Sequence, residues 1–388
     1  MSLPFTDRNR RRNPKPHQNP VPDAKRDDVD GGFDGSSFTG AVFNLSTTII
    51  GAGIMALPAA VKQLGLIPGS IMIILCAILT EFSIVTLLKF TRVSKTTTYS
   101  GVVRDSFGGI GRFLLLLSII FNNMGMLIAY MVIIGDVFSG TWSEGVHFSG
   151  VLEEWFGQQW WSTRPILLLL TTLFVFAPLT SFRRVAGVAI VKFANGSIGV
   201  PNLMPKVTSQ ESFWKLFTTV PILVTAYICH HNVHPIENEL KDPSHMNAIV
   251  RTSLLLCASV YIATSIFGIL LFGDNIQDDV LANFDGDLGV PYGTFLNDVV
   301  RVSYGFHLIL VFPIVFFSLR LNLDGLLFPH AIPLAFDNKR FCFVTIIIMA
   351  SVFVGANYVP SIWYAFQFTG ATTTISVGYI FPAAIALK

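Results

Sequence analysis

The chain has 388 residues, of which 52% are hydrophobic and only 13% are charged, and its mean hydropathy is +0.60. Soluble domains contain about 25% charged residues, so this composition excludes an ordinary soluble protein. The apolar residues form blocks of about 20, the length of a helix that crosses a bilayer. The sequence therefore predicts an all-α membrane protein with many spans.

The net charge of +2 indicates little about binding partners. The four cysteines lie in apolar spans, which is typical of small buried residues and not of a disulfide framework or a metal site. These are Cys76, Cys229, Cys257 and Cys342. We expect no metal, no cofactor and no enzymatic activity.

Residues 1–37 are polar and combine a basic cluster around Arg8–Arg12 with an acidic run at Asp27–Asp30. Such a segment cannot bury a hydrophobic core. We expect a disordered cytosolic tail here, followed by a polytopic transmembrane domain over residues 38–388.

The first apolar span, 38–60, is interrupted at mid-length by Gly51-Ala52-Gly53 and carries Asn44 and Thr48 before the interruption. In lipid, irregular backbone is tolerated only where it is buried in protein or lines a cavity. We expect a helix that is broken at mid-membrane and binds a ligand with its freed backbone. The alternative is close packing between helices, for which small residues are common.

Further helices are predicted at 69–90, 113–137, 165–180, 213–236, 252–272, 294–318, 341–359 and 362–387. Basic residues follow the second and fourth helices, whereas the loops at 139–164 and 273–293 are acidic. The positive-inside rule then places the N-terminus in the cytosol and both acidic loops outside. This arrangement requires one more crossing between Arg184 and Phe213. The only candidate, 185–200, spans about 24 Å, which is short of the ~30 Å hydrocarbon core.

The span 213–236 contains a second interruption, at Pro221, and ends in a polar cluster from Tyr227 to Pro235. With a fifth crossing at 185–200, the broken helices are the first of each five-helix half. Interrupted segments in corresponding positions are typical of the binding site of an inverted-repeat transporter.

Three histidines in the second cluster, His230, His231 and His234, allow two interpretations. Histidine titrates near neutral pH and suits proton coupling. Equally, the three rings could bond neighbouring backbone at the helix end. A diiron histidine box is disfavoured, because such a site needs many histidines, and the eight of this chain include His17 in the tail and isolated ones elsewhere.

Three motifs carry a resemblance to a known family: FNLSTTIIGAGIMALPAA, TAYICHHNVHPIENEL and VRVSYGFHLILVFPIVFFSLR. Together they resemble the amino acid/auxin permease family, in particular plant AVT-type amino acid transporters, which are related to sodium-coupled neutral amino acid transporters. The resemblance covers residues 38–387. It implies a leucine-transporter-like inverted repeat with broken helices 1 and 6, and amino acid transport driven by protons or sodium.

The sequence departs from this family in two places. Compared with what the resemblance implies, we expect a shortened helix 5 after Val185 and no helix 11 after Lys388. The leading hypothesis is secondary active transport of neutral amino acids. The alternative is a non-transporting amino acid sensor or an inactive short isoform.

The proposed substrate site combines the two breaks with residues of helices 3 and 8. Its residues are Thr48, Gly51, Ala52, Gly53, Asn122, Tyr227, Cys229, His230, His231, Asn232 and Tyr304. The glycine break offers backbone N–H groups and a positive helix end to a carboxylate. Unwound carbonyls suit an ammonium group. Asn122 could instead hold helices together.

Candidate ion-coupling residues are Thr47, Ser303, Glu81 and His307. Glu81 lies inside an apolar helix, where an ionisable group is costly and usually functional. Sodium-coupled relatives carry Asn at the position of Thr47, and a hydroxyl is a poorer ligand for a hard cation than an amide carbonyl. We therefore expect H+ and not Na+ as the coupling ion, with an amino acid and the lipid bilayer as partners, no nucleic acid, and a monomeric protein. The sequence does not choose between vacuolar, endomembrane and plasma membranes.

Overall fold

The computed structural model describes residues 36–388 except 52, 144–145, 158–201, 286–292 and 330. The predicted tail up to residue 35, the predicted fourth helix at 165–180 and the short fifth crossing at 185–200 therefore lie outside the described residues. So does Ala52 of the predicted substrate site.

The described residues are helical apart from one antiparallel hairpin, formed by β1 (Thr141–Ser143) and β2 (Val146–Phe148). Among them, seven helical segments are long and apolar enough to cross a membrane, and one bent helix pair would make an eighth. This confirms the predicted helical, multi-pass architecture. The hairpin and the short helix α5 (Val151–Phe156) lie in a segment that the sequence indicated only as an acidic loop.

The first span consists of α1 (Phe38–Ile49) and α2 (Gly53–Leu64), which are bent by 60° relative to each other. The bend falls at the Gly-Ala-Gly sequence. Ser37 caps the start of α1, because its side chain accepts a hydrogen bond from the backbone N–H of Gly40.

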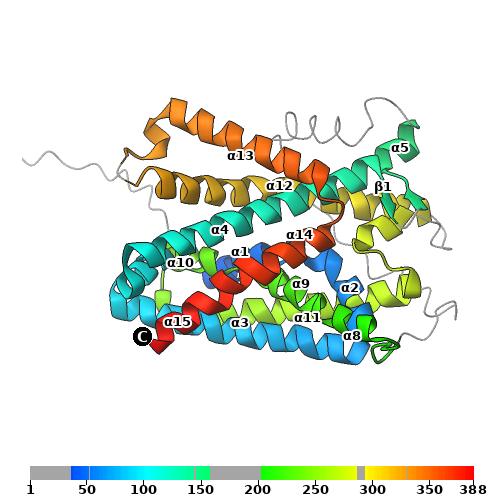
Figure 1. The fold of residues 1–388 in the computed structure, drawn as a ribbon, viewed down its shortest axis with the longest axis horizontal. Coiled ribbons are helices and arrows are strands. Elements are labelled where there is room, and N and C mark those ends of the chain that lie inside the picture. The colour runs from blue at the N-terminus through cyan, green and yellow to red at the C-terminus, as the bar shows by residue number, and fades with distance from the viewer. Residues whose placement is uncertain (1–35, 52, 144–145, 158–201, 286–292, 330) are drawn as a thin grey trace, which may run out of the picture. The chain divides into compact units, whose positions relative to one another are not determined.

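Two long helices, α3 (Leu66–Ser94) and α4 (Tyr99–Ser139), follow. Helix α4 begins earlier than the predicted residue 113 because it continues through a kink at Gly108, whose φ of +66° favours glycine. Helix α4 packs along α12 (Gly293–Leu327), as Figure 1 shows. The 35 residues of α12 correspond to roughly 52 Å, well beyond the hydrocarbon thickness, so this helix projects out of the membrane.

The span predicted at 213–236 is divided into three helices: α8 (Gln210–Phe217), α9 (Thr219–Ala226) and α10 (His230–Glu239). Pro221 lies in the first turn of α9, where the missing N–H is not needed. The second break is Tyr227–Cys229, between α9 and α10.

The remaining elements are mostly single helices with short 3₁₀ turns between them. They are η2 (Pro243–His245), α11 (Met246–Phe272), η3 (Gly273–Asn275), η4 (Val280–Asp285), η5 (Leu334–Phe336) and α13 (Asn338–Tyr358). The predicted helix at 362–387 is continuous but irregular. It contains α14 (Ile362–Thr369), the π-helical segments η6 (Gly370–Thr374) and η7 (Ser376–Ile380), and α15 (Phe381–Leu387).

The π-helical segments offer backbone carbonyls to neighbouring helices. The Tyr99 hydroxyl donates to the Val377 carbonyl at 2.7 Å, and the Ser83 hydroxyl donates to the Gly378 carbonyl. The wider π turn leaves carbonyls without their usual α-helical partner. These bonds therefore join the segment to α4 and α3.

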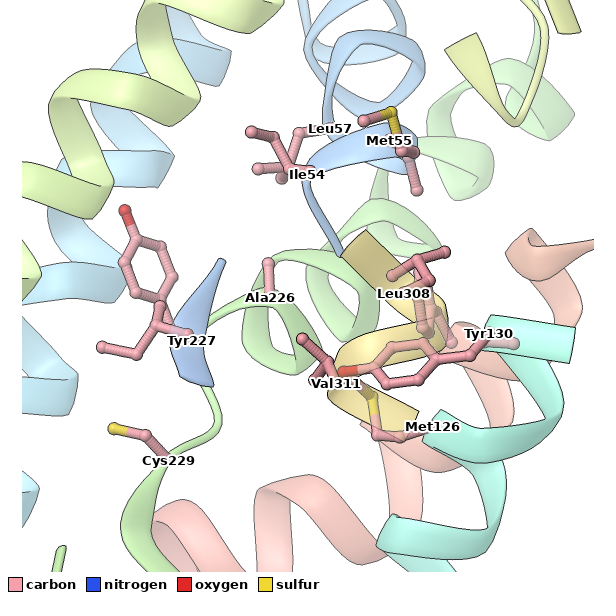
Figure 2. Packing of buried hydrophobic residues seen from close by; sticks show 14 of the residues in the cluster. Ile54, Met55, Leu57, Met126, Tyr130, Ala226, Tyr227, Cys229, Leu308 and Val311 are labelled. Carbon is pink, nitrogen blue, oxygen red and sulfur yellow. The ribbon is translucent and has the colours of Figure 1, made fainter. Parts of the chain in front are cut away.

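A continuous hydrophobic core fills the space around the two breaks. Figure 2 shows Ile54 and Met55 of α2, Tyr130 of α4 and Leu308 of α12 gathered around the end of α9 at Ala226. All of these side chains are buried. The breaks therefore lie inside protein, as irregular backbone in a membrane requires.

Glycine at position 370 is required by close approach of two backbones. A Cβ atom at Gly370 would lie 2.2 Å from the Pro221 carbonyl oxygen and 2.6 Å from the Thr225 hydroxyl oxygen. Since one of these contacts is backbone, it cannot be relieved by a side-chain rotation. Helix α9 and η6 are thus in direct backbone contact.

We predict that Gly370→Ala lowers stability by about 1–3 kcal/mol, the usual cost of overpacking a close-packed interior. Gly325→Ala is the matched control, since a Cβ there meets no atom within 4 Å. Thermal unfolding of both variants in detergent tests this. A melting temperature of Gly370→Ala equal to that of Gly325→Ala would contradict the close contact.

Candidate functional site

The first break exposes backbone carbonyls to side chains of α12. After α1, the N–H of Ile50 donates to Ser46 and that of Gly51 to Ile49, both at 2.8 Å. The Gly51 carbonyl accepts from the Tyr304 hydroxyl at 2.8 Å, and His307 Nε2 lies 3.3 Å from the Ile50 carbonyl oxygen. The structure thus brings Tyr304 and His307 to the break, and α12 lines it.

The two glycines of this break have steric roles as well. A Cβ at Gly51 would lie 2.7 Å from the Tyr130 hydroxyl oxygen, and a Cβ at Gly53 would lie 2.8 Å from the Ala226 Cα. The alternative reading of close packing therefore accounts for the choice of glycine at both positions. It leaves open what the backbone polar groups bind.

The second break brings the predicted residues Tyr227, Cys229, His230, His231 and Asn232 into one turn. The Tyr227 N–H donates to Val224 at 3.2 Å, and the Asn232 N–H donates to the Cys229 carbonyl at 2.9 Å. Cys229 and His230 are fully buried, whereas His231 and Asn232 are half-buried. The turn from Tyr227 to Asn232 is therefore surrounded mostly by protein.

One tyrosine of α11 joins the two breaks. The Tyr261 hydroxyl oxygen lies 2.7 Å from the Ile49 carbonyl oxygen, at the end of α1, and 2.7 Å from the Ala226 carbonyl oxygen, at the end of α9. Its ring also contacts Tyr227 edge to face, with 5.2 Å between ring centroids. Sequence reasoning missed Tyr261. The available signal was a tyrosine in an apolar span, because a buried phenol usually finds a hydrogen-bond partner.

Several buried polar atoms near the breaks have no hydrogen-bond partner within the described part of the chain. They are Ser46 Oγ, Tyr227 Oη, both ring nitrogens of His230, and His231 Nδ1. Leaving a buried donor or acceptor unpaired costs about 1–3 kcal/mol. Native proteins rarely accept this cost several times in one place, so these atoms are suited to a polar ligand or water.

The hydroxyl groups of Thr47 and Ser303, proposed for ion coupling, and of Thr48, proposed for the substrate site, bond to their own helices. Thr47 donates to Phe43 at 2.8 Å, Thr48 donates to Asn44 at 2.9 Å, and Ser303 donates to Val300 at 3.0 Å. A hydroxyl that donates its proton keeps lone pairs that can face a cation. The geometry therefore leaves these oxygens usable as acceptors.

Glu81 and Asn122 have other partners. Glu81 Oε1 accepts from Arg251 Nε of α11 at 2.7 Å, which ties α3 to α11. Asn122 Oδ1 accepts from Thr374 in η6 at 2.7 Å, and Asn122 Nδ2 donates to Asn123 at 3.4 Å. These contacts link helices, and in this structure they do not include the break residues.

His234 is likewise occupied away from the breaks. Its Nε2 lies 2.8 Å from the Thr91 hydroxyl oxygen of α3, and its ring stacks on Tyr99 with 6.0 Å between centroids. His234 Nδ1 has no hydrogen-bond partner among the described residues, as is also true of both nitrogens of His230 and of His231 Nδ1.

Arg301 of α12 is buried, although long basic side chains in membrane helices commonly extend to the interface. Its side chain is 1% exposed. The guanidinium donates to Glu154 Oε1 at 2.8 Å and to backbone carbonyls of Ser149 and Val137. The residue can be buried because a carboxylate of α5 and backbone carbonyls of α4 and of the loop before α5 neutralise and solvate it.

Comparisons with known proteins place the chain among membrane transporters. Residues 34–388 match the model of the family described as transmembrane amino acid transporter protein. Amino acid transporters AVT6A and AVT6B of Arabidopsis thaliana are 55% and 54% identical to the chain; each alignment covers 92% of the chain, and 82% and 84% of the relative.

A more distant relative is the putative sodium-coupled neutral amino acid transporter 11 of Mus musculus, which is 25% identical over 91% of the chain and 78% of its own length. The matched region includes both breaks and α12. The family match spans far more than half of the chain. The chain therefore belongs to the family of transmembrane amino acid transporter proteins.

Proposed function

We propose that the chain moves neutral amino acids across a membrane by secondary active transport, with the substrate bound between the two helix breaks. The observation that carries this proposal is the meeting of both breaks at Tyr261, beside buried polar atoms that have no partner in the described residues. Broken helices that meet at one place provide the backbone groups an amino acid needs.

The first break offers a site for the substrate carboxylate. Helix α2 starts at Gly53, and the first N–H groups of a helix have no partner within it. Together with the helix dipole they attract an anion. Helix α2 is buried along most of its length, so this attraction acts in a low dielectric.

The ammonium group of the substrate would face acceptors. The carbonyls at Ile49 and Ala226 share the single proton of the Tyr261 hydroxyl, so at any moment one of them lacks that bond. Either carbonyl can accept from an ammonium group. The unpartnered hydroxyl of Tyr227 and the nitrogens of His230 supply further polar contacts.

The preference for neutral amino acids rests on the charges around the site. The ionised residues described above are engaged elsewhere: Glu81 pairs with Arg251, and Arg301 pairs with Glu154. None of the described contacts places a charged side chain at either break, where it would oppose a charged substrate side chain. The name of the mouse relative also refers to neutral amino acids.

Proton coupling is proposed for two reasons. Thr47 offers a hydroxyl in place of the amide that sodium-coupled relatives carry, and a hydroxyl is the poorer ligand for a hard cation. His307 lies next to the Ile50 carbonyl at the first break and is able to bind a proton there. The chain would alternate access by moving one group of helices against the other, in a leucine-transporter-like inverted repeat with a cytosolic N-terminus.

Sodium replacement tests the coupling ion. We predict that proteoliposomes containing the chain keep their uptake of radiolabelled neutral amino acids when sodium is replaced by choline under an inward proton gradient. A protonophore should abolish concentrative uptake. Complete loss of uptake without sodium would overturn proton coupling, and no uptake under any ion would instead support a sensor or an inactive form.

Substitution of Tyr304 tests the first break. Tyr304→Phe removes the hydroxyl that donates to the Gly51 carbonyl, and an orphaned buried acceptor costs at least about 1 kcal/mol. We predict at least a fivefold fall in uptake per molecule of inserted protein. Tyr364→Phe, at an exposed position of α14, is the control. Equal uptake by the two variants would remove Tyr304 from the site.

A further inference from the structure

The segment 273–285, which follows α11, is held by three parts of the fold. Lys62 Nζ, near the end of α2, donates to the Asp274 carbonyl at 2.6 Å. The Ser361 hydroxyl, at the start of α14, donates to Asp278 Oδ2 at 3.0 Å. Helix η4 within this segment packs against α2, α4 and α12. Movement of the segment is therefore linked to the helix that follows the first break.

Asp279 is the buried acid of this segment. Its side chain is 6% exposed, and its Oδ1 accepts from the Leu281 N–H at 2.9 Å. Its Oδ2 has no hydrogen-bond partner among the described residues. An ionised carboxylate in such a place lacks the partners that normally offset the loss of water.

The charges around Asp279 do not neutralise it. Asp136 of α4 is also buried, and Asp278 adjoins Asp279 in the segment. Arg301 of α12 carries a positive charge here, but its guanidinium donates to Glu154 and to two carbonyls of the 137–149 region. The Lys62 ammonium is directed to backbone carbonyls, and Asp298 of α12 accepts from Trp155 at 2.7 Å. The carboxylates around Asp279 therefore outnumber the one guanidinium group close to it.

We propose that Asp279 is a proton-binding site, protonated when the segment 273–285 is closed against α2, α4 and α12. Acid on this face then favours the closed segment, and alkali releases it. A protonated carboxyl carries no net charge and gains a donor in its buried position. The proposal requires neither proton-driven transport nor a particular substrate.

The pH range follows from the surroundings. Burial, and after it the charge of Asp136, raise the pKa of Asp279 to about 7, from an ordinary value of 3.8. The Leu281 N–H and Arg301 oppose this to a smaller degree. The closed segment binds more protons than an open one. Ionisation of Asp279 therefore disfavours the closed state above pH 7. As the pH falls from 7 toward 4, the closed-to-open ratio rises by up to about tenfold per pH unit.

Spin-label distances in the full chain test the proposal. Labels at Asn275→Cys, on the segment, and Tyr358→Cys, at the end of α13, replace exposed side chains, and Cys342→Ser removes the exposed native thiol. Distances are measured by double electron–electron resonance in lipid nanodiscs from pH 5 to pH 8. We expect a single distance at pH 5 and a second population that grows as the pH rises and levels off above pH 7.

Three variants separate protonation from a purely structural role. Asp279→Asn, an uncharged mimic, should stay closed at all pH values. Asp136→Asn should reduce the open population at each pH above 5, because ionised Asp279 is then repelled less in the closed segment. Asp274→Asn, with a 75% exposed side chain, should behave as the parent. No change from pH 5 to pH 8, or unaltered pH dependence in Asp279→Asn, would overturn the proposal. Neither result depends on transport.

Discussion

The Tyr261 hydroxyl group is the interaction on which the centre of this protein depends. It lies at hydrogen-bonding distance from the last carbonyl of α1 and the last carbonyl of α9, and it has one proton for both. Two interrupted helices are thereby kept together by a third, α11. In a membrane, where water does not supply replacement partners, a hydroxyl in this position determines which carbonyl is available to something else.

Small residues make this meeting possible. Gly53 allows the start of α2 to touch the backbone of Ala226, and Gly51 makes room for the hydroxyl of Tyr130. Around this contact, α1, α2 and α3 pack on α11, whereas α4 packs on α12 and α13. The breaks lie between these two sets of helices. A ligand there would contact both sets, which is the arrangement that alternating access needs.

Much of the architecture could be predicted from the sequence, because blocks of apolar residues define membrane helices. Gly51–Gly53 and Tyr227–Cys229 mark the ends of helices that composition alone would have joined. Helix ends were harder to predict: helical residues begin 14 residues before position 113, and the non-helical backbone of Gly108 kinks α4 between the two stretches. The partners of Glu81, Asn122 and Tyr261 could not be predicted, since each lies on another helix far away in sequence.

The irregular helix from Ile362 to Leu387 has a mechanical consequence. The Val377 and Gly378 carbonyls accept hydrogen bonds from hydroxyls of α4 and α3, and the backbone at Gly370 is in close contact with α9. Rotation of this helix about its axis would break hydrogen bonds to two other helices and would force its backbone at Gly370 against α9. The helix is therefore fixed in rotation relative to α3, α4 and α9.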